Sequence, residues 1–348
     1  MPADVTAPDA SPRPPAGGVR RWLALVTDPT PVSLRRLALA GVIVTAGIVA
    51  TGAAVRLSQS GLGCPTWPDC TKSSLVAART PGDPMFHTWI EFSNRLVTFV
   101  LMVVGLAALV AAWRFRPGGT GARRRDLVWL AAMQPLGVVA QALIGGVVVL
   151  TKLNPYWVSV HFFVSVAVVA AAVALHVRCT EGTGPATALA RAELRLLAGV
   201  LVVVVLAMLA AGTVVTGTGP LAGAAGVPRY HLQLQGVTQF HADIGWALGG
   251  VVFALVLGLR LTGAPARVTR VSYVLLGLVA VQGLLGYIQY FSGLPAGLVW
   301  VHESASMLIW IGALRLLYAM RDRGSVTDPA PAATAAAARP AAENAAAG

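Results

Sequence analysis

Long apolar runs, separated by short polar stretches, dominate the hydropathy pattern of the chain. Eight of these runs reach the roughly 20 residues that an α-helix needs to cross the hydrocarbon core of a bilayer. The pattern therefore predicts an all-α integral membrane protein with eight transmembrane helices. The runs lie at residues 37–56, 89–113, 127–150, 157–177, 196–216, 236–259, 271–291 and 298–318.

The two ends of the chain lack this pattern. Residues 1–36 are rich in proline, alanine, aspartate and arginine, and residues 319–348 are rich in alanine and proline. Segments of this composition bury too little apolar surface to fold, so we expect two disordered tails. The first apolar run is too long to be the core of a cleaved signal peptide.

Basic residues are unevenly divided between the two sides that these spans define. One side, with both tails and the link at 178–195, holds most of the arginines, including Arg123, Arg124 and Arg125. Because basic loops stay in the cytoplasm, we expect both termini to be cytoplasmic in a multi-pass protein of the cell (plasma) membrane. The other side carries Arg56, Lys72, Arg79, Lys152 and Arg229.

The overall composition agrees with a membrane protein. The 348 residues are 56% hydrophobic and 11% charged, whereas soluble domains carry about 25% charged residues. A net charge of +12 would suggest nucleic acid in a soluble protein. Here the charge lies in short loops between apolar spans, where it orients the chain, so we expect no nucleic-acid partner.

The apolar part consists of two similar halves, 37–177 and 196–318. Residues 141–161 read QALIGGVVVLTKLNPYWVSVH, and residues 282–302 read QGLLGYIQYFSGLPAGLVWVH. A constant offset aligns the first glutamine, a central leucine and the final histidine of each segment. Internal similarity of this kind indicates two equivalent units, here two duplicated four-helix bundles that pack side by side. The aligned pairs are Gln141 with Gln282, Leu153 with Leu294, and His161 with His302.

The similarity continues earlier in each half. The first and fifth spans end in TGAAVRLSQSGLG and AGTVVTGTGPLAG, which aligns Gly52 with Gly212. The second and sixth spans open with IEFSNR and VTQFHA, which places Asn94 opposite His241. The two halves therefore differ at a position where one of them has a histidine.

Three histidines lie within about two turns of the outer ends of their spans: His161, His241 and His302. Ionisable residues are costly inside a membrane and are functional candidates for that reason. His241 and His302 belong to two helices of one half, and facing imidazoles in a bundle can hold heme iron from both sides. The structural alternative is a histidine bonded to a backbone carbonyl. Zinc and non-heme metal sites need three or four close ligands and fit less well.

Glu91 is an acidic candidate at the outer start of the second span. It shares a helix face with Asn94 and precedes Arg95 by four residues, so an ion pair is the structural alternative. In the functional interpretation, its carboxylate beside the first-half site takes up a proton or positions water.

Cys64 and Cys70 lie in the outer loop GLGCPTWPDC. That compartment is oxidising, so we expect a disulfide that closes a short loop over the bundle. A redox-active pair that exchanges with a partner thiol is the alternative.

Together these features resemble the heme A synthase family, membrane enzymes that oxidise heme O to heme A. The resemblance covers about 37–318, and each of its motifs is weak alone although the combination is specific. It rests on the two similar four-span halves, the loop CPTWPDC, the segment IEFSNR, and the hairpins LNPYWVSVH and LPAGLVWVH.

The resemblance implies that the half 196–318 binds a heme b cofactor, with His241 and His302 as iron ligands. The half 37–177 would bind the substrate heme O through His161 and the position of Asn94, with Glu91 as the catalytic carboxylate. Water would supply the oxygen that converts the C8 methyl of heme O to a formyl group for terminal oxidases.

Further partners follow from the same resemblance. They are the membrane lipid, a heme O synthase and an electron acceptor, and a homo-oligomer is compatible with the sequence.

The chain departs from the family pattern at Asn94, where the family has a histidine. A carboxamide oxygen is a poor ligand for heme iron compared with imidazole. We therefore hypothesise that the heme of the first half has His161 as its only protein ligand, with its other face open to water or to Glu91.

Two other functions remain open at this stage. A b-type cytochrome that only carries electrons also needs paired histidines, but it gives no reason for Glu91 beside the second site. A transporter with repeats would bind its substrate at the midplane, whereas the polar groups here cluster near the outer ends.

Overall fold

The structure is a computed structural model, which describes residues 18–72, 74–78, 84–119 and 121–326. Within these residues, eight helices are long and apolar enough to cross a membrane, and each contains one of the predicted spans. The prediction of an eight-helix membrane protein is confirmed. The helices are α2 (Pro31–Leu57), α3 (Met85–Arg114), α4 (Arg125–Leu150), α5 (Pro155–Arg178), α6 (Ala192–Thr218), α7 (Leu234–Leu261), α8 (Ala266–Phe291) and α9 (Ala296–Ala319).

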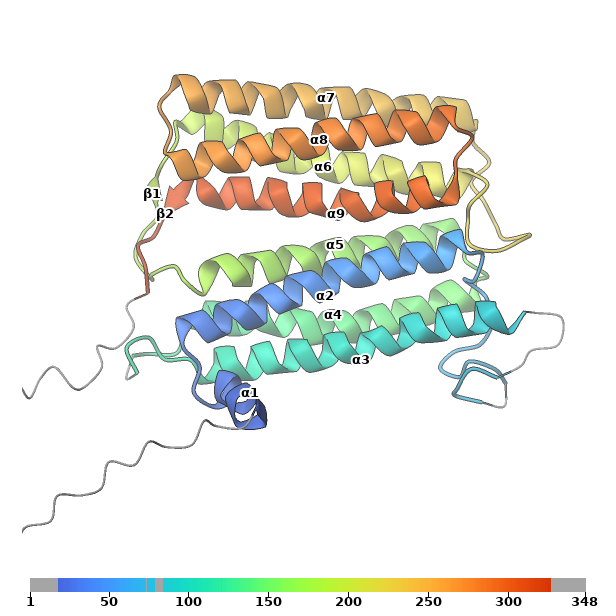
Figure 1. Ribbon diagram of the computed structural model, residues 1–348, viewed down its shortest axis with the longest axis horizontal. Helices are drawn as coiled ribbons and strands as arrows, with labels where there is room; N and C mark the ends of the chain where they lie inside the picture. The colour runs from blue at the N-terminus through green and yellow to red at the C-terminus, as the bar shows by residue number, and fades with distance from the viewer. Residues whose placement is uncertain (1–17, 73, 79–83, 120, 327–348) are drawn as a thin grey trace, which may run out of the picture.

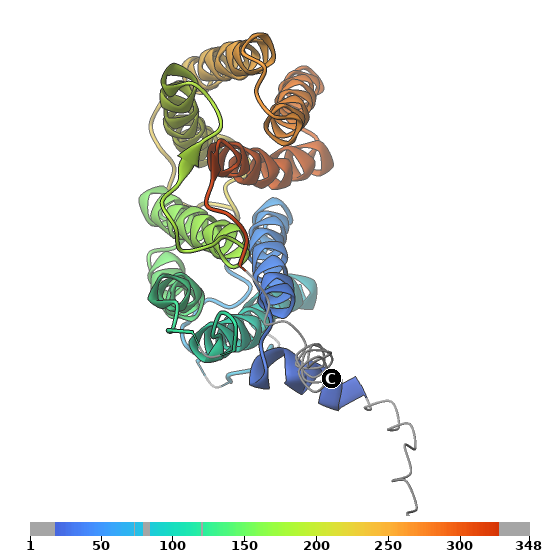
Figure 2. The same ribbon diagram turned by 90° about the vertical axis from the view of Figure 1, so that its left-hand side faces the viewer.

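The eight helices form two four-helix bundles, α2–α5 and α6–α9, which lie one above the other in Figure 1. In each bundle every helix packs against the next, and the first packs against the last. Helices α2 and α5 of the first bundle contact α9 of the second, and α5 also contacts α6. Figure 2 looks along the helices and shows the two groups meeting at these elements.

The core that joins the bundles is apolar and continuous. It includes Val166 and Val173 of α5, Leu201 of α6, and Met307 and Trp310 of α9. The indole of Trp310 also donates a hydrogen bond of 3.0 Å to the Val166 carbonyl. The indole nitrogen needs a partner when it is buried, and the neighbouring bundle supplies one.

The turns before α5 and α9 have the same backbone geometry. Leu153 and Leu294 both adopt left-handed φ values, of 58° and 61°. Each leucine amide donates a 2.8 Å hydrogen bond to a carbonyl five residues earlier, that of Val148 or Gln289. The similar turns therefore start the two histidine-bearing helices in the same way.

The prediction of a disordered segment over 1–36 is wrong for its second part. Residues Gly18–Thr27 form helix α1, which packs against α2 and α3. Helix α2 already begins at Pro31, where Thr30 and Ser33 form a capping box. Proline is favoured in the first helical turn and the cap satisfies free amides, so the helix starts before the apolar run. Residues 1–17 lie outside the described part of the chain.

The C-terminal tail is also ordered at its start, which the expectation of a disordered segment from 319 missed. Strand β2 (Arg321–Asp322) pairs antiparallel with β1 (Thr187–Ala188) of the link between the bundles. The amide of Val326 then donates to the Thr180 carbonyl. These contacts with the link satisfy backbone N–H and C=O groups of the tail, which the composition of the tail did not predict. Residues 327–348 lie outside the described part.

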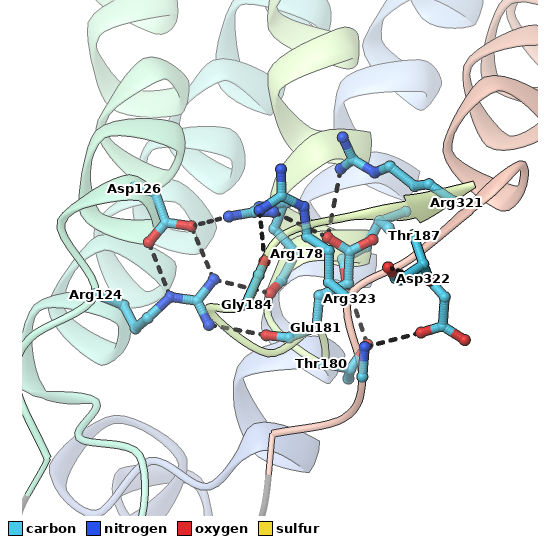
Figure 3. Close-up of polar contacts among 12 residues, drawn as sticks. Arg124, Asp126, Arg178, Thr180, Glu181, Gly184, Thr187, Arg321, Asp322 and Arg323 are labelled. Atoms are coloured by element: carbon cyan, nitrogen blue, oxygen red, sulfur yellow. Dashed lines mark hydrogen bonds and ion pairs between the residues drawn. The ribbon is translucent and has the colours of Figure 1, made fainter. Parts of the chain in front are cut away.

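An ionic cluster surrounds this strand pair, at the end of the molecule where α2 begins and α9 ends, here called the terminal face (Figure 3). Asp126 pairs with Arg124 and Arg178, at 2.8 and 2.7 Å. Glu181 pairs with Arg178 and Arg321. The cluster thus joins α4 and α5 of one bundle to the segment that leaves the other.

Replacing Asp126 with asparagine is expected to destabilise the protein by about 1–3 kcal/mol, because the nearly buried Arg124 loses its carboxylate partner. Thermal unfolding in detergent measures this loss. Glu193→Gln is the matched control, since the Arg191–Glu193 pair on the same face is exposed and contributes little. Equal melting temperatures for the two variants would contradict a stabilising role for the cluster.

Two further side chains at the terminal face are structural. The Nδ1 of His176 lies 3.2 Å from the Arg35 carbonyl. Cys179 is a buried free thiol, and burial raises its pKa to about 12. Because the thiolate is the reactive form, Cys179 is inert at neutral pH.

Candidate functional site

The second bundle brings its two candidate ligands together, one from α7 and one from α9. The ring centroids of His241 and His302 lie 6.4 Å apart, with their planes inclined by 67°. Metal–imidazole bonds are about 2 Å long, so two imidazoles on opposite faces of one iron have centroids roughly 6 Å apart. The spacing of this pair therefore fits a single heme iron between the rings.

Each of the three candidate histidines packs on a glycine of a neighbouring helix. A Cβ added at Gly212, Gly286 or Gly145 would lie 3.4, 3.2 or 3.3 Å from the Cε1 atom of its histidine. The partners are His241 on Gly212, His302 on Gly286, and His161 on Gly145. The absence of a side chain at these glycines allows the rings to approach the helix backbones closely.

In each of the three histidines, the two ring nitrogens, Nδ1 and Nε2, have different surroundings. The Nδ1 atoms are buried and have no hydrogen bond of good geometry to another described residue. No hydrogen bond from Nε2 to the described part of the chain is present. Because Nδ1 is buried against the protein and Nε2 is not among the buried atoms, the rings are suited to ligation through Nε2.

Two glutamines stabilise the turns that carry the histidines. The side chain of Gln282 in α8 donates a 2.7 Å hydrogen bond to the backbone carbonyl of His302. Gln141 in α4 makes the same contact with the His161 carbonyl at 2.9 Å. The sequence alignment matched these glutamines but did not reveal what they bind. Their contacts help to position the histidine-bearing helices.

The first bundle does not form a second histidine pair. His161 lies on α5 and Asn94 on α3, and no hydrogen bond joins them in the described structure. The Asn94 amide instead donates a 2.8 Å hydrogen bond to the hydroxyl of Thr51 on α2. Binding of the substrate heme by both residues stays a prediction.

The Glu91 carboxylate is almost fully buried and both of its oxygens accept hydrogen bonds. Oε1 pairs with Arg95 at 2.7 Å, and Oε2 accepts from the Cys64 amide at 2.8 Å. Arg95 also donates to the carbonyls of Cys64 and Thr66. The ion pair that the spacing suggested is therefore present, and it holds the disulfide loop onto α3.

The loop itself is closed by the disulfide Cys64–Cys70, and both cysteines are fully buried. The Trp67 ring packs on Gly146 of α4, where an added Cβ would lie 2.6 Å from the indole. Gly146 is next to Gly145, which supports His161. The loop thus covers the end of the first bundle that contains His161 and Glu91.

An ion pair that the sequence pattern does not reveal joins the two bundles at the same end. Arg56 of α2 pairs with Glu303 of α9, which follows His302 in the sequence. Arg56 also donates to the Leu221 carbonyl. The Trp300 indole adds a 2.8 Å hydrogen bond to the Ala50 carbonyl. The Arg56–Glu303 pair therefore connects the region beside His302 in the second bundle with α2 of the first bundle.

Comparison with known proteins identifies the family. The family model described as COX15-CtaA, cytochrome oxidase assembly protein, matches residues 35–314. The chain belongs to this family. The match includes α3 to α8, most of α2 and α9, and every candidate site residue in both bundles.

Individual relatives of the family carry the name heme A synthase. The chain is 36% identical to that of Geobacillus kaustophilus over 122 residues, which cover 34% of each protein. It is 30% identical to that of Methylorubrum populi over 182 residues, or 50% of this chain and 45% of the relative. The aligned segments thus span between a third and a half of these relatives. The chain is also similar to a protoheme IX farnesyltransferase of Chloroflexus aurantiacus. The identity there is 34% over 82 residues, which cover 24% of this chain and 13% of that protein.

Proposed function

We propose that the protein is a heme A synthase, an oxidoreductase that converts the C8 methyl of heme O to a formyl group with oxygen from water. The observation that carries this proposal is the paired arrangement of the two bundles. One holds the His241–His302 pair at the spacing of two heme ligands. The other has His161 on the same kind of glycine support, close to the loop held by Glu91. Family membership and the names of its relatives support the same activity.

The two sites have different roles in this proposal. His241 and His302 hold a heme b cofactor, which supplies one-electron chemistry when bound. His161 holds the substrate heme O and orients its reacting methyl group. The distinct sets of side chains in the two bundles explain how one chain can keep one heme and process another.

The balanced reaction defines what the protein must handle. Conversion of a methyl group and one water to a formyl group releases four protons and four electrons. Glu91 is the proposed proton acceptor near the substrate, with Arg95 fixing its carboxylate and the disulfide loop limiting access of bulk water. The electrons pass to an acceptor in the membrane.

The proposed setting follows from the charge distribution. The terminal face, which carries most of the arginines, lies in the cytoplasm of a cell (plasma) membrane protein, and the disulfide loop lies on the outer side. A heme O-producing farnesyltransferase is a proposed partner, because it would supply the substrate. The local similarity to one such enzyme is compatible with that association.

Heme extraction from cells that express the full chain together with a heme O-producing enzyme tests the proposal. Mass spectrometry is expected to detect heme A, or its hydroxylated precursor, only when the chain is present. Recovery of heme b and unchanged heme O would instead support a b-type cytochrome that carries electrons only. Purified protein without any heme would contradict both functions.

A further inference from the structure

The histidine–glycine contacts leave one position unfilled. Three glycines support a histidine ring, but the fourth, Gly52, is different. It aligns with Gly212, which supports His241, yet an added Cβ at Gly52 would meet nothing within 4 Å. The opposing residue there is Asn94, which is shorter than histidine. The first bundle therefore has open space where the second has an imidazole.

Hydrogen bonding restrains Asn94 in this arrangement. The Thr51 hydroxyl donates to the Ile48 carbonyl at 3.1 Å, so its oxygen must accept the 2.8 Å bond from the Asn94 amide. The residue that corresponds to Thr51 in the second bundle is Ala211, which cannot make this bond. The hydroxyl is thus present only in the half that has asparagine. The pair holds the carboxamide nitrogen toward α2.

We propose that the heme of the first bundle has His161 as its single protein ligand, and that the space over Gly52 is a binding site for a small exchangeable ligand. The ligand class is a small molecule of one to three heavy atoms that coordinates heme iron, for which carbon monoxide and azide are suitable probes. Asn94 and Thr51 form the polar wall of this site. The inference rests on the proposed function only in assuming that the first bundle binds heme.

A half-open first site and a closed second site would separate the two roles of the molecule. With a heme bound, the His241–His302 pair would supply both iron ligands from the protein, which suits electron transfer and would exclude small ligands. A site with one protein ligand leaves room for a reactant beside the iron. The contrast comes from one side chain, histidine or asparagine, facing equivalent glycines.

Spectroscopy of the purified full-length protein, with its hemes bound, tests this inference. After reduction, carbon monoxide is expected to shift the absorbance of one of two hemes and leave the other unchanged. Azide is expected to perturb the same fraction in the oxidised protein. Two hemes that both ignore carbon monoxide would overturn the inference while leaving the proposed function intact. A protein with heme in the second bundle alone would overturn both.

Variants at the open position give a direct control. Asn94→His is expected to fill the space over Gly52 and to reduce carbon monoxide binding at least about tenfold, as the iron gains a second imidazole. Asn94→Leu removes the bond to Thr51 without adding a ligand, and should weaken carbon monoxide binding less than Asn94→His does. His161→Ala should remove the heme that binds carbon monoxide. Weaker binding in Asn94→Leu than in Asn94→His, or full binding in a folded Asn94→His that keeps the second heme, would contradict the proposal.

Discussion

Purified His302→Ala protein is expected to lose most of its low-spin heme b. His302 faces His241 at 6.4 Å and no third histidine in the described structure accompanies this pair. Loss of groups that merely orient a metal ligand already costs about 10–100-fold in affinity, so removal of a ligand should cost at least that much. The pyridine hemochrome assay would then find about half of the heme content of the wild-type protein, and the remaining heme would be in the first bundle.

Two further variants make the result specific. His231→Ala changes an exposed histidine outside the helices and should leave the heme content unchanged. On α8, Gly286→Ala places a methyl group 3.2 Å from His302, whereas Gly283→Ala meets nothing within 4 Å. We expect a weakened or spectrally shifted heme only for Gly286→Ala. An undiminished Soret band after replacement of both His241 and His302 would end the assignment of this site.

Replacing Glu91 with glutamine is expected to lower heme A formation by about 10²–10⁴-fold, the range for removal of a general base. Glutamine keeps an oxygen that can accept the hydrogen bond from the Cys64 amide, but it cannot take up a proton at neutral pH. The heme content and the Cys64–Cys70 disulfide should therefore remain. Heme extraction and thiol labelling of the same preparation measure both.

Arg95→Gln separates proton transfer from the structural ion pair. This variant removes the other charge of the pair and leaves the Glu91 carboxylate in place. If Glu91 acts only by holding the loop, Arg95→Gln should be at least as inactive as Glu91→Gln, because Arg95 also donates to the Cys64 and Thr66 carbonyls of the loop. Retention of at least about a tenth of the activity in Arg95→Gln would support the catalytic role.

The sequence alone determined the eight helices, through its hydropathy pattern, and the two halves, through the similarity of their motifs. A bilayer imposes a length of about 20 apolar residues on each span, so the spans can be read without knowledge of the fold. The same local rules identified His161, His241 and His302, because ionisable residues are rare at such depth. Local composition failed at α1 and β2, whose order depends on packing against α2 and α3 and on pairing with β1.

Only the tertiary structure decided how these side chains meet. The approach of His302 to His241, the glycine beneath each ring, and the pairing of Arg56 with Glu303 all join different helices. Their relative rotation and distance depend on packing of whole bundles, which no local sequence pattern encodes. For the same reason, the alignment could place Asn94 opposite His241, but only the packing revealed the empty space over Gly52 and the bond to Thr51.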